Sequence, residues 1–174
     1  MANLKEIRNR IASVSSTMQI TSAMKMVSAA KLKKATDAIT EMRPYSNKLT
    51  ELIQKLTKTN HELESNSFSE VREIKKELLI AITSNRGLCG GFNSNVIKAI
   101  YEMTDSKTKV KTSVISIGKK GSDLLSKKFN MHSSHDDIFD NLNFESVSKI
   151  VDLILNEFNE GKYDSVKIIY NRFK

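Results

Sequence analysis

The sequence of 174 residues contains one cysteine, one proline, six glycines and no tryptophan. The single cysteine, Cys89, excludes an intrachain disulfide, and so low a cysteine content is typical of a reducing compartment. No apolar run approaches the roughly 20 residues of a membrane-spanning helix, and the longest strong one is Leu78–Ile82. The N-terminus also lacks the apolar segment of a secretory signal. These absences predict a protein that is soluble and intracellular, or peripheral to a membrane.

Acidic residues are scarce in the first third of the chain. The net charge is +8, from 28 Lys and Arg against 20 Asp and Glu. Residues 3–58 carry eleven basic and four acidic side chains, whereas the remainder is almost balanced, with seventeen and sixteen. A basic segment of this kind predicts an acidic partner, which could be a nucleic acid, an anionic membrane surface or acidic protein loops.

Residues 3–58 contain no glycine, and their only helix breaker is Pro44. Counted in threes and fours from Leu4, twelve of sixteen positions are apolar, and we call this row the apolar seam. Its polar exceptions are Thr21, Lys25, Ser28 and Ser46; its apolar members are Leu4, Ile7, Ile11, Val14, Met18, Leu32, Ala35, Ile39, Met42, Leu49, Ile53 and Leu56. The spacing predicts one helix from about Leu4 to Leu56, roughly 80 Å long, bent near Pro44 and paired with a second helix.

The rest of the chain alternates short apolar runs with amphipathic segments. Strands are expected at Glu77–Thr83, Ser113–Ile117 and Ser165–Tyr170. Helices are expected at Ser94–Met103, at Ser122–Phe129 with Leu124 and Leu125 inward, and from an Asn143 cap to Glu160. The last helix has an apolar stripe of Val147, Ile150, Val151, Ile154, Leu155 and Phe158. Residues 130–143 are mostly polar, which predicts an irregular connection that could include a short strand. This order predicts an α/β domain with a mainly parallel sheet.

A glycine-rich turn at residues 85–93 follows the first predicted strand and opens a helix, which is where α/β folds bind phosphate. It lacks the lysine of a phosphate-binding loop, and its glycines do not have the dinucleotide-binding spacing. We therefore interpret it as a tight turn whose glycines adopt positive φ, and expect no bound nucleotide or other cofactor.

Two other groups of residues carry potentially reactive or metal-binding side chains. Cys89 could be activated at a helix N-terminus, but no partner histidine is marked in the sequence, so we expect a buried or half-buried turn cysteine. His132, His135, Asp136 and Asp137 are metal-ligand types at close spacing, with His61 the only other histidine. Because they fall in a polar connection, a solvated loop is the better interpretation, and no metal site is expected.

The basic residues of the first helix leave more than one interpretation open. Arg8, Arg10, Lys31, Lys33 and Lys34 could follow phosphates, or could simply form a solvated face. The segment has no interleaved aromatic residues and no nucleic-acid-binding signature follows it, which disfavours nucleic acid. The methionines at positions 18, 24 and 26 give an adaptable surface that suits contact with several different neighbours.

Two stretches resemble a known family. Glu6-Ile7-Arg8-x-Arg10-Ile11-Ala12-Ser13-Val14, followed by Thr17-x-Gln19-Ile20-Thr21-x-Ala23-Met24-x-Met26-Val27-x-Ala29-x-Lys31, is similar to the N-terminal helix of the γ subunit of F-type ATP synthases. Arg86-Gly87-Leu88-Cys89-Gly90-Gly91 resembles a signature of that subunit's globular domain. Asn85 departs from the family, which usually has aspartate there.

The resemblance implies an α/β fold with a long N-terminal coiled-coil helix (1–58), a linker (59–76) and a Rossmann-like, mainly parallel domain (77–174). It implies a non-catalytic rotor subunit that transmits torque between the membrane c-ring and the catalytic β subunits. The implied partners are the α, β and ε subunits and the c-ring, at the cytoplasmic face of a bacterial inner membrane. The implied contact residues of the helix are Arg8, Thr21, Met24, Lys25 and Lys31, with the positive ones meeting acidic β loops.

The length of the apolar seam leads to one further expectation. A seam of roughly 80 Å needs a partner of similar length, whereas the other predicted helices are short and have a sheet to cover. We therefore expect the partner helix to lie outside these 174 residues, and the isolated chain to self-associate. Two rival classes remain: a basic coiled-coil adaptor that binds nucleic acid, and a small α/β enzyme that uses the glycine-rich turn. Salt-dependent binding to duplex DNA would favour the first, and nucleotide protection of Cys89 would favour the second.

Overall fold

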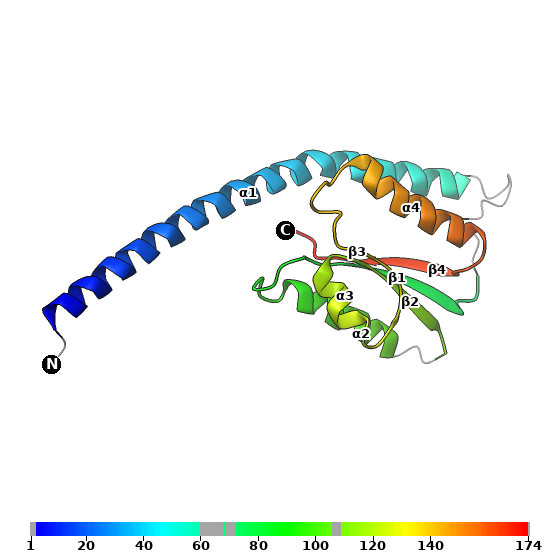
Figure 1. Cartoon of the computed structure of the whole chain (residues 1–174). Coiled ribbons are helices and arrows are strands. Elements are labelled where there is room, and N and C mark those ends of the chain that lie inside the picture. The colour runs from blue at the N-terminus through cyan, green and yellow to red at the C-terminus, as the bar shows by residue number, and fades with distance from the viewer. Residues whose placement is uncertain (1–2, 60–67, 69–71, 106–108, 174) are drawn as a thin grey trace. The chain divides into compact units, whose positions relative to one another are not determined.

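The computed structural model describes residues 3–59, 68, 72–105 and 109–173. The chain divides into two compact units, Met1–Glu64 and Ser65–Lys174. The first unit consists of one long helix, and the second is an α/β domain (Figure 1). Most of the predicted linker at residues 59–76 lies outside the described residues, so its bounds stay a prediction.

Helix α1 (Leu4–Thr59) is a single 56-residue element with Pro44 inside it, which confirms the predicted uninterrupted helix. Its first turn is anchored by the Asn3 carbonyl, which accepts from the backbone N–H groups of Glu6 and Ile7 at 2.8 and 3.1 Å. Figure 1 shows α1 as one gently curved helix. Every described apolar-seam residue with a large side chain is exposed, from Leu4 at 72% to Ile39 at 38%. The side chains that the predicted coiled coil would bury against a second helix are therefore uncovered in α1.

Threonine hydroxyls along α1 donate hydrogen bonds to backbone carbonyls one turn earlier in the same helix. The Thr21 hydroxyl donates to the Thr17 carbonyl at 2.8 Å, and Thr17 donates to Ser13 at 2.9 Å. The same i→i−4 bond recurs at Thr36, Thr40 and Thr50. Such bonds hide the hydroxyl group, leave the methyl group outward and tend to bend helices. Thr21, one of the polar exceptions in the apolar seam, therefore presents a less polar surface than its residue type suggests.

The second unit is built on a four-stranded sheet in the order β3-β2-β1-β4, and all three strand pairings are parallel. Its strands are β1 (Lys76–Ile82), β2 (Lys111–Ile117), β3 (Asn130–His135) and β4 (Ser165–Ile169). Its helices are α2 (Phe92–Asp105), α3 (Lys119–Leu125) and α4 (Phe144–Asn159). The predicted α/β class with a mainly parallel sheet is confirmed.

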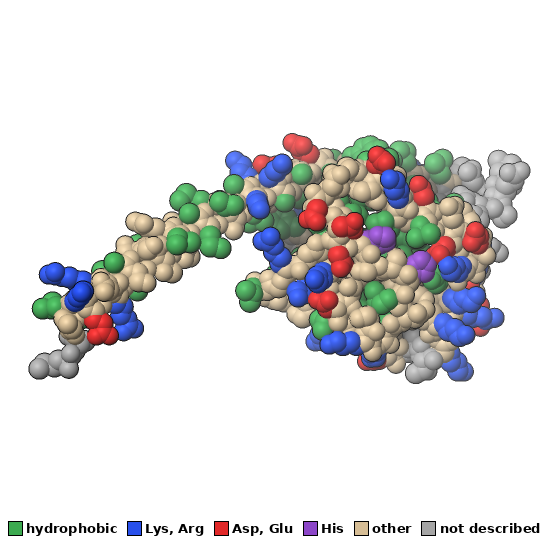
Figure 2. All heavy atoms as spheres, in the orientation of Figure 1, with side chains coloured by type: hydrophobic (Ala, Val, Ile, Leu, Met, Phe, Trp, Pro, Cys, Tyr) green, Lys and Arg blue, Asp and Glu red, His purple; other side chains and the backbone are tan. Residues whose placement is uncertain are grey.

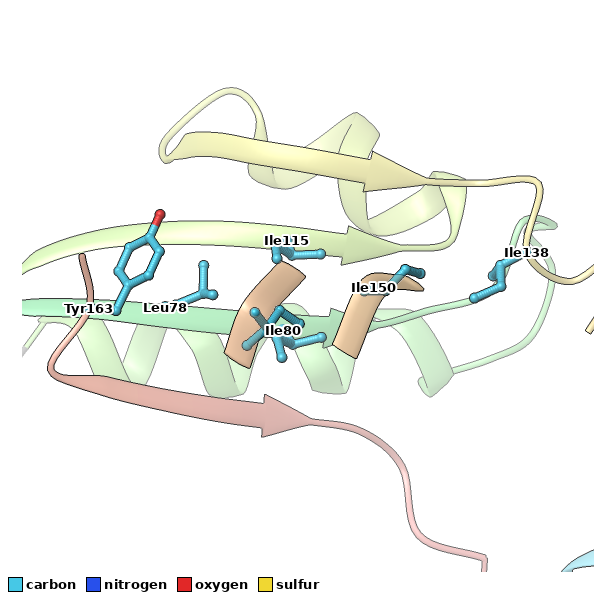
Figure 3. Close-up of a cluster of buried hydrophobic side chains, with 7 residues drawn as sticks. Leu78, Ile80, Ile115, Ile138, Ile150 and Tyr163 are labelled. Carbon is cyan, nitrogen blue, oxygen red and sulfur yellow. The ribbon is translucent and has the colours of Figure 1, made fainter. Parts of the chain in front are cut away.

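Each face of the sheet has its own apolar core. One cluster joins β1 and β2 to α4 and is drawn in Figure 3; its buried members are Leu78, Ile80, Ile115, Ile138, Ile150, Ile154 and Tyr163. The other joins the sheet to α2 and α3; its buried members are Leu79, Ala81, Val96, Ile97, Ile100, Val114 and Leu125. Alternate residues of β1 therefore serve opposite layers, as expected of a strand buried on both faces.

Two sequence-based predictions about the helices are wrong in part. Leu124 is 44% exposed, because α3 ends at Leu125 and turns only Leu125 into the core. In α4 the Asn143 cap is confirmed by a capping box with Ser146, but Val147, Val151 and Leu155 are exposed. Burial in α4 is confined to one narrow row, which consists of Ile150, Ile154 and the polar Glu157, so the predicted apolar stripe is wider than the face that is buried.

We predict that Gly121→Ala destabilises the domain by about 1–3 kcal/mol, because a Cβ there would lie 2.6 Å from Ser116 Oγ and 2.8 Å from Thr83 Oγ1. Both hydroxyls are buried and hydrogen-bonded, so neither has room to move. Urea denaturation should show a lower midpoint. The matched control is Gly87→Ala, where the nearest atom is 3.9 Å away and the expected change is within about 0.5 kcal/mol. Equal midpoints for the two variants would contradict the steric argument.

Candidate functional site

The glycine-rich turn lies at the carboxyl end of β1, between that strand and α2. Leu88 at φ 60° and Gly90 at φ 58° both adopt left-handed backbone conformations. For leucine this conformation costs energy, and the side chain is also fully exposed. The predicted positive φ of the turn's glycines is therefore confirmed at Gly90 but wrong for Gly87 and Gly91. The tip of the turn presents a strained, solvent-facing Leu88. Arg86, Gly87, Cys89 and Gly91 flank that tip and are exposed as well.

Cys89 is exposed, so the prediction of a buried or half-buried cysteine is wrong. The sulfur lies beside polar groups of the same turn and of α2: the Ser84 hydroxyl, the Arg86 carbonyl and the Asn93 amide. Asn93 donates from Nδ2 to the sulfur at 3.1 Å, and its Oδ1 accepts from the backbone N–H of Ser84 at 2.9 Å. The thiol is thus part of the bonding that shapes the turn.

The N-terminus of α3 meets the turn after β1, which supplies acceptors for its first amides. The N–H groups of Lys119, Lys120 and Gly121 donate to Asn85 Oδ1, the Ser84 carbonyl and Thr83 Oγ1 at 3.0, 3.1 and 2.8 Å. At a helix N-terminus these are the donors that an anion would use. Here they are already bonded to the chain's own oxygens, and the N-terminus of α4 is likewise closed by its capping box.

The two histidines near the end of the sheet lie in β3, which corrects the interpretation of this stretch as a solvated loop. His132 is largely buried, and its Nε2 lies 2.9 Å from Glu157 Oε1 of α4; Lys162 bonds to the same oxygen. His135 instead contacts Ser133 Oγ at 3.1 Å. The register of β3 shifts opposite Val114 and Ile115, so simple alternation does not hold between the two histidines. Each imidazole bonds to a different partner, and no cluster of metal-ligand types is found within the described part of the chain. His61 falls outside the described residues.

Burial alone would raise the pKa of Glu157, but its hydrogen bonds with Lys162 and His132 outweigh burial and hold that pKa below the usual 4.5. Asp164, directly before β4, accepts from the backbone N–H groups of Lys76 and Lys75, and these bonds lower its pKa. Glu157 thus joins α4 to β3 and to the turn before β4, and Asp164 joins the same turn to the start of β1. The ionised forms therefore stabilise the fold.

The contact residues predicted for the helix all lie on α1 and are exposed: Arg8, Thr21, Met24, Lys25 and Lys31. Thr21, Met24 and Lys25 are three and four residues apart, so they share a face, and Lys31 returns to that side seven residues after Met24. Arg8 lies roughly 140° around the helix from Thr21, so the five residues do not form one patch. Figure 2 shows hydrophobic side chains along α1 and a group of Lys and Arg side chains near its N-terminal end.

Within the described ranges no helix is both long and apolar enough to cross a membrane.

Comparison with known proteins finds a match over nearly the whole chain. The family model described as ATP synthase matches residues 3–174. The chain is 61% identical over 174 residues to the ATP synthase gamma chain of Flavobacterium johnsoniae and 40% identical over 176 residues to that of a Geobacter species. Each match covers the whole of this chain, which spans 61% of the length of these relatives.

Solved structures agree. A chain from the central stalk and c-ring structure of the Tetrahymena thermophila mitochondrial ATP synthase matches with a TM-score of 0.67 and 28% identity. That match covers 89% of this chain and 66% of the other. A chain from the rotor structure of the Euglena gracilis mitochondrial ATP synthase matches in fold, with a TM-score of 0.52 and 22% identity, over 95% of this chain and 56% of the other.

We predict that Glu157→Gln destabilises the domain at pH 7 and that the difference from wild type shrinks as the pH falls below about 4.5. A lowered folded-state pKa contributes stability that is present above the ordinary value and lost as protonation of the folded state begins. Urea denaturation at several pH values measures this. Glu102→Gln, on the exposed face of α2, is the charge-matched control. A Glu157→Gln deficit that is independent of pH would contradict the ionic role.

Proposed function

This chain belongs to the ATP synthase family, in which its relatives are gamma chains, and we propose that it works as the γ subunit of the central stalk. The activity is mechanical: α1 forms part of a shaft that carries torque between a membrane c-ring and the catalytic β subunits. The single observation that supports this most strongly is the family match over residues 3–174, at up to 61% identity among the relatives compared.

The physical character of α1 suits a rotating shaft. It is one helix of 56 residues whose large apolar side chains are exposed, so it is built to be covered by other protein. A second helix along the apolar seam would give bending stiffness. The methionines at positions 18, 24 and 26, in its N-terminal half, and the inward-turned threonine hydroxyls provide contacts that are soft and weakly directional. Such contacts let the shaft pass different neighbours without binding any one tightly.

We assign subunit contacts to Arg8, Thr21, Met24, Lys25 and Lys31. Lys25 stands at an apolar-seam position, so it is the residue least explained by pairing with a second helix. A lysine there would face acidic loops of the surrounding β subunits, for which the basic charge of residues 3–58 provides long-range attraction. Met24 and Thr21 would supply apolar contact beside it.

We place the α/β domain at the foot of the rotor, in contact with the ε subunit and the c-ring. The protein would then be peripheral to the membrane, at the cytoplasmic face of a bacterial inner membrane. The bacterial origin of the relatives supports this location. The turn of Arg86, Gly87, Leu88, Cys89, Gly90 and Gly91 is the most protruding apolar feature of the described carboxyl edge, and we assign it a contact with another subunit.

In this proposal the chain is not an enzyme and carries no cofactor or metal, and nucleotide chemistry belongs to the β subunits. The support is geometric: the backbone donors that could hold a phosphate at α3 are bonded to Asn85, Ser84 and Thr83. The turn after β1 also ends in no lysine suited to a nucleotide phosphate.

The nucleotide prediction is tested on the chain alone. Calorimetric titration with Mg·ATP should show no binding at micromolar concentrations, because the first amides of α3 are bonded to internal oxygens and the glycine-rich turn lacks the lysine of a phosphate-binding loop. A dissociation constant in the micromolar range, or ATP hydrolysis by the purified chain, would contradict the non-catalytic role.

The rotor proposal is tested in cells of the source organism. An affinity-tagged copy should co-purify with the α and β subunits, and failure to recover them would overturn the proposal.

Within the assembled complex, Lys25→Glu should lower the ratio of proton pumping to ATP hydrolysis severalfold while changing the free energy of unfolding by less than about 0.5 kcal/mol. The control is Lys34→Glu, nine residues on and half a turn around α1, which should leave the ratio unchanged. Early melting of Lys25→Glu with normal coupling would make Lys25 merely structural.

A further inference from the structure

Asn85, in the turn after β1, bonds to the turns that follow two other strands. Its Oδ1 accepts from the backbone N–H of Lys119, which opens α3 after β2, at 3.0 Å. Its Nδ2 donates to the carbonyl of Asp136, just after β3, at 2.5 Å. One half-buried side chain thus joins the carboxyl-edge turns of β1, β2 and β3.

This connection differs from the others at the same edge. Backbone bonds join neighbouring turns, with Lys120 N–H donating to the Ser84 carbonyl and Gly118 N–H donating to the His135 carbonyl at 3.1 and 3.2 Å. The strand order is β3-β2-β1-β4, so β1 and β3 are not neighbours. Asn85 reaches across the intervening β2 turn, which makes the three turns one bonded body.

The bonding requires an amide. The Lys119 N–H can only be accepted by Oδ1, which leaves Nδ2 to face the Asp136 carbonyl. An aspartate has the same size and could still accept from Lys119. Its second oxygen, however, would face a carbonyl oxygen, with two acceptors and no proton between them, and the Asp136 carbonyl would lose its donor.

We infer that Asn85 is a positioning residue that presets the glycine-rich turn in the free chain, so that Leu88 is presented by a rigid edge before any partner binds. Leu88 holds a left-handed backbone at φ 60° with its side chain in solvent. Such a conformation persists only where the surrounding bonds over-determine it. Asn85 lies three residues before Leu88 and ties the start of the turn to two other loops. The inference concerns the free chain and does not depend on a rotor function.

Amide hydrogen exchange and ¹H–¹⁵N relaxation of the free chain test the inference. In Asn85→Ala both bonds are lost, so the Lys119 amide and the Asp140 amide, which donates to Asp137 in the turn after β3, should each exchange roughly five- to tenfold faster. In Asn85→Asp at pH 7 only the Asp140 amide should do so. The heteronuclear NOE of the Leu88 amide should fall in both variants. Asn130→Asp, the same change at the exposed start of β3, should alter none of these.

Lowering the pH provides a second test, because a purely steric role of Asn85 would give no recovery in acid. A protonated aspartate has one donor and one acceptor, as the amide does, so Asn85→Asp should regain Asp140 protection as the pH falls from 7 to about 4. Unchanged Lys119 exchange or an unchanged Leu88 NOE in Asn85→Ala would overturn the inference. Failure of Asn85→Asp to recover in acid would overturn the requirement for a donor. These results leave the rotor proposal untouched, since it is tested by co-purification.

Discussion

The α/β domain depends on how one edge of its parallel sheet satisfies its polar groups. A parallel sheet brings the carboxyl ends of its strands and the N-terminal amides of the following helices to the same edge, where they need partners. Here the turn after β1 supplies them: Thr83, Ser84 and Asn85 accept from the first three amides of α3. The many α/β proteins that leave these donors open use them for phosphate. Closing them turns a potential ligand site into a structural joint.

That joint has strict steric requirements. Gly118 has φ 103°, and a Cβ there would lie 2.3 Å from the Thr83 carbonyl oxygen. Gly121 meets the Thr83 and Ser116 hydroxyls closely, which allows the α3 backbone to approach β1. The close approach is what brings Lys119 within reach of Asn85. The protruding turn with Leu88 at its tip is therefore supported by contacts several residues away along the chain and on other strands.

Helix α1 obeys a different constraint. Within its own unit no described element covers its apolar seam, and an isolated amphipathic helix gains little from propensity alone. Its residues act as a surface that other protein must complete. This contrast between a domain that satisfies its own polar groups and a helix that leaves its apolar seam uncovered suits the proposed rotor role, in which a rigid foot would carry a shaft held by its surroundings.

The sequence by itself determined α1, the parallel α/β class and the Asn143 cap, because these depend on local spacing: threes and fours without glycine, alternating apolar runs, and a short polar residue before a helix. The sequence also indicated the family, through two short motifs. Only the tertiary structure decided that His132 pairs with Glu157, that Cys89 and Leu124 are exposed, and that Asn85 joins three turns. Each of these depends on which strands lie side by side and how closely their turns approach. No local pattern encodes that, because the partners are brought together only when the sheet forms.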